Sequence, residues 1–303
     1  MPSIRELFGL SQIRAPKEDG VFAMPCNIGV EVELEGYVAD FNDANLHYWN
    51  VTSDGSLRNN GVEFVFKRPT SGQDIISAID ELQAHLLVVG CQTSHRCSVH
   101  VHVDMSEETR EVVEKFYLLC MLLEPSLYAM GNKARYDNIY CPGLTHATQQ
   151  ITDAATLFLS DDFVLQRVGE WCKYSGINLA CLNRFGTVEV RNHAGTTDIS
   201  QVLPTIAALI AIKKLATEYT KEYIQKIQSI EELLAGLKGS PVYTSLLTPE
   251  LMLYFNNTKL NLQYYNLTQL ALTEADLGQQ PIRYTASHHI RERLVGFQFT
   301  LAG

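Results

Sequence analysis

The stretch "SVHVHVDMS", residues 98–106, places a valine at every second position and fills the gaps with His100, His102 and Asp104. Alternation of this kind predicts a β-strand with one apolar face and one polar face. The polar face carries only imidazole and carboxylate groups, which are common metal ligands. The strand therefore raises the question of whether its second face binds a cation.

A second strand with an unusual polar face is predicted at "NIGVEVELEG", residues 27–36. Glu31, Glu33 and Glu35 lie on one face, with no basic residue among them. Carboxylates two residues apart on one face repel one another, more strongly if water is partly excluded. A bound cation would stabilise this arrangement, whereas a solvated edge strand is the simpler interpretation.

Two further strands repeat the pattern. "GVEFVFKRP", residues 61–69, presents Glu63, and "TVEVRNH" presents Glu189, Arg191 and His193 on the face opposite its valines. One sheet, apolar on one side, would bring these groups together. Carboxylates with one or two histidines suit Mg²⁺ or Mn²⁺ better than a structural zinc, because the set contains no sulfur ligand. Several hard cations on one sheet can hold a polyphosphate.

The elements that must position these strands are helical. Helical spacing of apolar residues predicts a helix within residues 71–90, a second over 107–130 and a third over 202–227. Ser106 is the expected N-cap of the second helix, and Pro125 is expected to kink it. Two strands are expected around the "NRFGT" turn, residues 183–187. The fold class is α+β: a largely antiparallel sheet with helices on one face.

Composition limits the class of partner. The chain has 303 residues, 46% of them apolar, and a formal charge of -10 from 24 Lys and Arg against 34 Asp and Glu. Without a basic footprint we expect no nucleic-acid or membrane partner. The first 20 residues lack a signal-peptide core, and we expect no run of about 18 apolar residues to span a bilayer, which favours the cytosol. The seven cysteines include no CxxC pair and are expected to be reduced and mostly buried.

Other functions fit parts of the pattern. His100, His102 and Glu107 have the local spacing of a cupin metal motif, which would indicate an oxygenase or isomerase. Glu107, however, is expected to enter a long helix, whereas a cupin continues into another strand. A metal-dependent hydrolase could use the same ligands, and Glu189 with Arg191 could be a simple salt bridge.

Taken in order, these segments resemble the amidoligase family of carboxylate-amine ligases, which is related to glutamine synthetase and glutamate-cysteine ligase. The matching pieces are "GVEVELEG", "SDGSLRNNGVEFVFKRP", "CSVHVHVDMS", "ARYDNIYC" and "INLACLNRFGTVEVR", and together they span about residues 26–200. The resemblance implies a curved, glutamine-synthetase-like sheet whose concave face holds ATP and either Mg²⁺ or Mn²⁺. It implies a catalytic domain over residues 1–235, followed by a helical or irregular extension over 236–303.

The resemblance also implies roles for individual residues. The metal ligands would be Glu31, Glu33, Glu63, Glu189 and one or both of His100 and His102. Arg191, Glu189, Arg184 and Arg135 would be catalytic, with Arg191, His102 and Arg135 binding the nucleotide. The family commonly has glycine where this chain has Ser98, which narrows the space over that strand.

The reaction implied is the ATP-dependent joining of a carboxylate substrate to an amine substrate through an acyl phosphate. Each substrate could be a small molecule or the end of a peptide or protein. Such chemistry depends on positioning and electrostatics, and no protein nucleophile is required. A kinase on the same fold remains an alternative, because phosphoryl transfer needs the same metal-binding face.

Overall fold

The computed structural model describes residues 1–39, 45–138, 140–144, 146–159, 168, 171 and 174–277. Its centre is one six-stranded sheet in the order β2-β3-β1-β4-β6-β5, with every neighbouring pair antiparallel. The strands are β1 (Ile28–Leu34), β2 (Trp49–Ser53), β3 (Val62–Phe66), β4 (Ser98–Asp104), β5 (Ile177–Asn178) and β6 (Thr187–Ala194). The predicted α+β class is confirmed as an open antiparallel sheet. Its curvature and its likeness to glutamine synthetase stay predictions.

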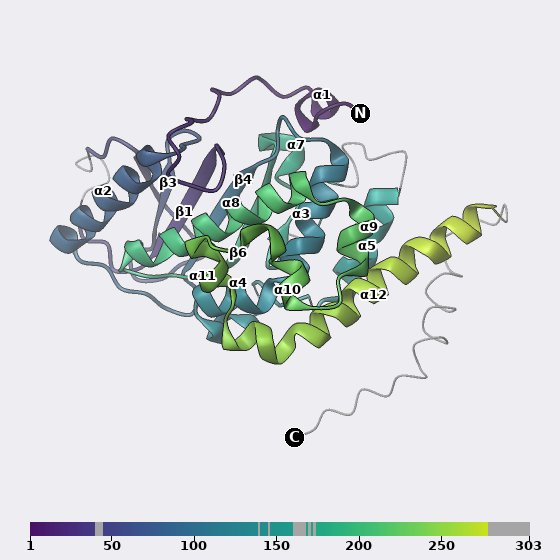
Figure 1. The fold of residues 1–303 in the computed structure, drawn as a ribbon. Coiled ribbons are helices and arrows are strands. Elements are labelled where there is room, and N and C mark those ends of the chain that lie inside the picture. The colour runs from purple at the N-terminus through teal and green to yellow at the C-terminus, as the bar shows by residue number, and fades with distance from the viewer. Residues whose placement is uncertain are drawn as a thin grey trace.

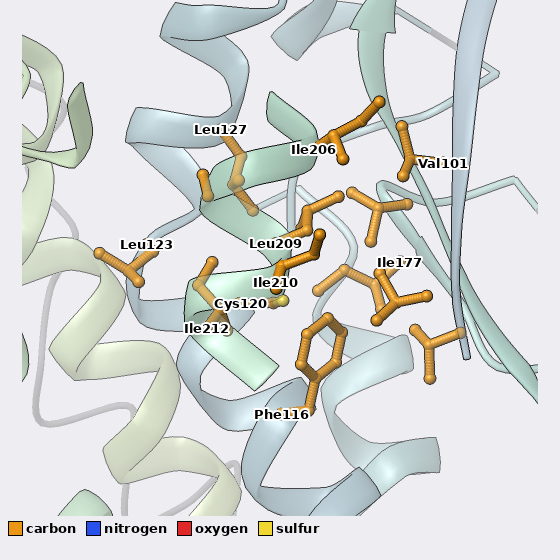
Figure 2. Close-up of a cluster of buried hydrophobic side chains, with 14 of the residues drawn as sticks. Val101, Phe116, Cys120, Leu123, Leu127, Ile177, Ile206, Leu209, Ile210 and Ile212 are labelled. Atoms are coloured by element: carbon orange, nitrogen blue, oxygen red, sulfur yellow. The ribbon is translucent and has the colours of Figure 1, made fainter. Parts of the chain in front are cut away.

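The valine face of the sheet forms the core with the helices. Val30, Val101 and Val190 are 1% exposed and face α2 (Gln73–Val89), α3 (Arg110–Leu122) and α8 (Val202–Glu218). In Figure 1, α2 and α8 lie across the front of the strands. Figure 2 shows Val101 and Ile177 of the sheet beside Phe116 of α3 and Leu209 of α8. Burial of this apolar surface, at roughly 25 cal/mol per Å², fixes the sheet against its helices, and the polar face points away from these helices.

The helix predicted over 107–130 is two helices, and its start was wrongly placed. The N-cap is Thr109, whose side chain accepts a hydrogen bond from the Val112 N–H, so that α3 begins at Arg110. Ser106 instead donates its backbone N–H to Asp104. Pro125 does more than kink the helix: it lies in the first turn of a new helix, α4 (Glu124–Met130), where its missing N–H costs nothing.

The helix predicted over 202–227 also divides. Thr220 caps a new helix, α9 (Lys221–Lys226), by accepting from the Tyr223 N–H. Contrary to expectation, one helix among the described residues, Ile199–Glu218, is long and apolar enough to cross a membrane by length and composition. Because 67% of its apolar window is buried inside the molecule, these properties are also those of a core helix.

The remaining helices surround this framework. They are α1 (Ile4–Phe8), η2 (Lys133–Asp137), α5 (Thr148–Leu159), α7 (Leu182–Phe185), η3 (Ile199–Gln201), α10 (Ile230–Leu233), η4 (Ala235–Leu237), α11 (Pro241–Leu246) and α12 (Pro249–Leu277). The long helix α12 packs against α3, α4 and α5. Its Tyr265 hydroxyl and Gln269 amide both donate to the buried Glu114 carboxylate of α3, at 2.6 and 3.1 Å. The domain boundary at residue 235 stays a prediction.

The cysteines follow the expectation of reduced thiols wherever the structure describes them. All six described cysteines are free, and Cys26, Cys97, Cys120 and Cys141 are buried. Cys91 and Cys181 are partly exposed. Cys172 lies outside the described residues.

Candidate active site

Strand register brings the predicted ligands together on the sheet face opposite the helices. Glu31 of β1 stands opposite His100 of β4, and His102 stands opposite Glu189 of β6. On the other side of β1, Glu33 stands opposite Glu63 of β3. Directly opposed residues in antiparallel strands project to the same face. Three strand pairs therefore gather four carboxylates and two imidazoles into one region.

The first group of ligands consists of Glu31, His100 and Glu189. His100 Nδ1 lies 3.0 Å from Glu31 Oε2 and 3.3 Å from Glu189 Oε1. One ligand atom from each residue lies within 4.8 Å of the others, a separation that one cation could bridge. His100 is 3% exposed and Glu189 4%, so the group is largely shielded from water.

Ser98 determines which nitrogen of His100 is available to a ligand. The Ser98 hydroxyl donates a short hydrogen bond to Glu33 Oε2. The Ser98 Oγ atom also lies 2.8 Å from His100 Nε2. Because the single hydroxyl proton goes to the carboxylate, the histidine must donate through Nε2–H. In neutral His100 the lone pair is then on Nδ1, which faces Glu31 and Glu189. The residue that departs from the family pattern thus orients His100.

The second group consists of Glu33, Asp54 and Glu63, again with ligand atoms within 4.8 Å of one another. Burial raises the pKa of Glu63 to about 7, and the charges of Glu31 and Glu33 add to the effect. Repulsion of this kind is what a bound cation would relieve. Sequence reasoning missed Asp54, because it follows β2 in a turn where no periodicity indicates which way a side chain points. The only indication in the sequence was that Asp54 belongs to the segment "SDGSLRNNG", which is part of the family resemblance.

Charges in the first group favour ionised carboxylates. Burial alone would raise the pKa of Glu31, but its interactions with His100 and His102 outweigh burial and hold the pKa well below its usual range. For Glu189, likewise, the charges of His100 and Arg191 outweigh burial and lower the pKa. Both carboxylates are therefore ready to bind a cation near neutral pH.

A third group combines His102, Glu189 and Cys181, which the sequence analysis did not include. The Cys181 thiol donates to Glu189 Oε2 over 3.4 Å from the N-terminal end of α7. His102 Nδ1 contacts the Thr187 hydroxyl at 3.0 Å. His102 Nε2 lies 3.2 Å from Glu31 Oε1 but has no hydrogen-bond partner among the described residues. The structure thus places one sulfur atom beside two of the predicted ligands.

Arg191 is the cation nearest to these carboxylates. Its terminal nitrogen lies 2.5 Å from Glu189 Oε1 and 3.4 Å from His100 Nδ1. Burial would lower its pKa, but Glu189 outweighs burial and raises it, so the guanidinium stays charged. Within the described part of the chain its buried Nε has no acceptor. The salt bridge with Glu189 is thus present, and a donor remains for a ligand.

The other two predicted arginines lie apart from the carboxylates. Arg135 of η2 is 4% exposed and donates to the Arg191 and Cys97 carbonyls, both at 3.2 Å. It links β6 to the residue just before β4. Nucleotide contact by Arg135 stays a prediction. Arg184 is exposed and its guanidinium lies 4.8 Å above the Phe185 ring. The Phe185 ring in turn meets the His102 ring edge-on at 6.2 Å, which places Arg184 at the rim of the site.

His193 does not share the face that its spacing predicts. Between Val99 and Val101 the register of β4 and β6 shifts, so that His193 stands opposite the core valine Val99. A one-residue shift turns a side chain to the other face. His193 is buried there, with Nδ1 donating to the Ala194 carbonyl at 2.7 Å.

Three other polar residues have local partners. Glu35 accepts from the Arg58 N–H at 2.9 Å, and Asp104 accepts from Asn27 and from the Ser106 N–H. Glu107 forms a surface salt bridge with Arg5 at 2.7 Å, away from both strand histidines. The cupin arrangement, in which Glu107 would join His100 and His102, is therefore excluded.

The donor chemistry fits divalent cations. Five carboxylates surround two imidazoles, and the buried His102 Nε2 is left without a hydrogen bond. Oxygen-rich sets of this kind suit Mg²⁺ and Mn²⁺. A buried nitrogen without a partner normally costs stability, and a ligand would offset that cost.

A pocket of about 180 Å³ lies at the N-terminal end of β1. Its lining includes Asn27, Tyr48, Arg14, Arg68 and Lys17. Lys17 is paired with Asp74 at 2.6 Å, whereas the Arg14 and Arg68 guanidinium groups have no partner among the described residues. Asn27 lies four residues before Glu31 and on the same strand face, which at about 3.3 Å per residue separates them by roughly 13 Å.

Comparison with known proteins identifies the family of the chain. The family model described as "Putative amidoligase enzyme" matches residues 6–213, well over half of the chain. This range contains all six strands and every residue of the three ligand groups. No curated protein matches the chain. On the strength of the family match, the chain belongs to the amidoligase family, whose members are described as enzymes and, by name, as ligases.

Proposed function

We propose that the protein is an ATP-dependent carboxylate-amine ligase that requires Mg²⁺ or Mn²⁺. The observation that carries the proposal is the adjacency of two oxygen-rich ligand groups on one shielded sheet face, with the guanidinium of Arg191 beside them. Membership of the amidoligase family supports a ligase over other users of such a site.

The two groups would divide the cations between them. Glu31, His100 and Glu189 would hold one cation, and Glu33, Asp54 and Glu63 another. When bound, such cations neutralise the charge of the β- and γ-phosphates and of the transferred oxygens. Ser98 links the two groups, because its hydroxyl contacts both Glu33 and His100.

Arg191 would stabilise the charge that moves during phosphoryl transfer. Its Nε is a buried donor without an acceptor among the described residues, and a preorganised donor of this kind costs no reorganisation when charge develops. Glu189 orients the guanidinium through the 2.5 Å contact. Asn178 holds Glu189 from the other side, by donating to Oε2 at 2.5 Å.

The proposed reaction has two steps. An oxygen of the substrate carboxylate attacks the γ-phosphorus of ATP, ADP leaves, and a mixed acyl phosphate forms. The substrate amine then attacks the acyl carbon, inorganic phosphate leaves, and the amide bond remains after the nitrogen loses a proton. Neither step needs a protein nucleophile.

The substrates are an acid and an amine, each a small molecule or the end of a peptide or protein. The pocket beside Arg14 and Arg68 is a candidate position for a negatively charged end of one of them, because both guanidinium groups lack partners within the described chain. The net charge of -10 supports the expectation of no nucleic-acid partner and no anionic membrane surface. The cytosol is the proposed compartment.

Product analysis tests the proposal. The protein is incubated with Mg²⁺ and ATP and with pools of carboxylic acids and amines, separately and together, and ADP, phosphate and new amides are measured. A ligase forms ADP, phosphate and amide in equal amounts only when acid and amine are both present. A stable phosphorylated product formed without an amine would identify a kinase. Turnover of a substrate without consumption of ATP would identify a hydrolase.

A further inference from the structure

We propose that His102, Cys181 and Glu189 form a separate binding site for a softer cation, Zn²⁺, which overlaps the proposed magnesium site by sharing Glu189. The three ligand atoms lie within 4.8 Å of one another and offer one nitrogen, one sulfur and one oxygen. Zn²⁺ binds all three donor types, and three protein ligands with an open fourth position are usual in its accessible sites. Mg²⁺, by contrast, has little affinity for sulfur.

A second observation that points to a ligand is the state of His102. The side chain is 10% exposed, and its Nε2, which lies 3.2 Å from Glu31 Oε1, makes no hydrogen bond among the described residues. Its other nitrogen, Nδ1, contacts the Thr187 hydroxyl at 3.0 Å, which holds the ring and allows the Nε2 lone pair to face the group. Metal-bound histidines are oriented by such outer contacts.

Cys181 is placed to complete the site. It stands at the N-terminal end of α7, is partly exposed, and donates its thiol proton to Glu189 Oε2 over 3.4 Å. Partial exposure gives a cation a path from solvent. Binding replaces that S–H hydrogen bond with a sulfur–metal bond, and the thiol proton is released to solvent.

Sharing Glu189 couples the two sites. The carboxylate contacts His100 through Oε1 at 3.3 Å in the magnesium group and Cys181 through Oε2 at 3.4 Å in the zinc group. A zinc ion bound to Oε2 would withdraw negative charge from Oε1, and would thus weaken both cation binding in the magnesium group and the 2.5 Å contact to Arg191. The effect of zinc on the magnesium site rests on the proposed function, whereas the zinc site itself is defined by its three ligands.

Cobalt titration of the full chain tests the site without any assay of activity. Co²⁺ replaces Zn²⁺ at such ligands and gives a thiolate-to-cobalt charge-transfer band in the near ultraviolet. We expect this band in the wild type, its loss on addition of Zn²⁺, and its persistence in excess Mg²⁺. Cys181→Ser should remove the band and lower zinc affinity at least tenfold. Cys91→Ser, which changes the other partly exposed described cysteine, should leave both unchanged.

A second measurement does not depend on the folding of a variant. One equivalent of Zn²⁺ should protect Cys181 of the wild type from alkylation by iodoacetamide, as read by mass spectrometry of its peptide. No thiolate band in the wild type, a band that survives in Cys181→Ser, or equal alkylation with and without zinc would each overturn the proposal. Failure of Mg²⁺-ATP binding with the cobalt band intact would instead overturn the proposed ligase function alone.

Discussion

At the scale of single residues, hydrogen bonds among side chains orient the candidate metal ligands. Ser98 connects the two ligand groups, since it donates to Glu33 and accepts from His100. Two side chains keep unfavourable interactions. The buried Nε of Arg191 has no acceptor in the described structure, and the negative charge of Glu63 is disfavoured by burial and by neighbouring carboxylates.

Ser98→Ala tests the orienting role. Without the hydroxyl, His100 is free to take the other tautomer, so we expect divalent-cation affinity to fall about 10- to 100-fold, as for other outer contacts of metal ligands. Calorimetric titration with Mn²⁺ measures it. Ser200→Ala, which removes a surface hydroxyl bonded to Asp198, is the control and should bind like the wild type. Equal affinity in Ser98→Ala and the control would remove Ser98 from the site.

Glu63→Gln tests the repulsion in the second group. The pKa of Glu63 is raised from 4.5 to about 7, so its contribution to stability is present below pH 4.5 and is lost as the pH rises through 7. The metal-free glutamine variant should therefore match the wild type near pH 4.5. At pH 8 it should be the more stable by roughly 1 to 2 kcal/mol, allowing for solvent screening. Urea unfolding at both pH values measures the difference, and identical pH profiles would contradict the assignment.

Arg191→Lys separates a phosphate contact from a structural ion pair. Lysine keeps the charge but loses the planar fork, so we expect ATP turnover to fall about 100-fold while nucleotide affinity changes less than tenfold. The free energy of unfolding should stay within about 1 kcal/mol of wild type. Arg5→Lys, in the surface salt bridge with Glu107, is the matched control. Normal turnover in Arg191→Lys would show that Arg191 only pairs with Glu189 and does not contact the phosphate.

At the scale of elements, the sequence predicted which residues share a sheet face. It did not predict the register shift between strands or the side chains that reach the site from turns. Strict alternation in β1, β3 and β4 assigned Glu31, Glu63 and His100 to one face, because a pleated strand allows only two directions. The register shift in β6 is invisible in its sequence and turns His193 away. Asp54 and Cys181 reach the site from turns, where no period constrains direction.

Arg135 stabilises the arrangement of elements, because it links β6 to the residue just before β4. Arg135→Met should leave the Arg191 and Cys97 carbonyls without that donor and lower the free energy of unfolding by about 2 to 4 kcal/mol. Arg184→Met removes an equal charge at an exposed position and should change stability by about 0.5 kcal/mol or less. Thermal unfolding of both variants measures the contrast. Equal stability would show that Arg135 is not a structural tie.

At the scale of the whole molecule, the sheet separates an apolar face that packs against helices from a polar face that carries the candidate ligands. The helices α2, α3 and α8 cover one face of the sheet (Figure 1). Helix α12 is held to α3 through the buried Glu114. A packed core of this kind holds the ligand groups at fixed separations. Binding at the site should therefore appear as stability of the entire chain.

The most direct test of the central claim is thermal unfolding of the full chain with Mg²⁺ and ATP, singly and together. We expect Mg²⁺ and ATP together to stabilise the wild type by about 2.7 kcal/mol at a hundredfold excess over the dissociation constant. ATP without Mg²⁺ should have little effect, because the carboxylates repel a bare triphosphate. The stabilisation should be lost in the Glu31→Gln, Glu63→Gln double variant, which removes one ligand from each group. No stabilisation of the wild type by millimolar Mg²⁺-ATP would contradict the account.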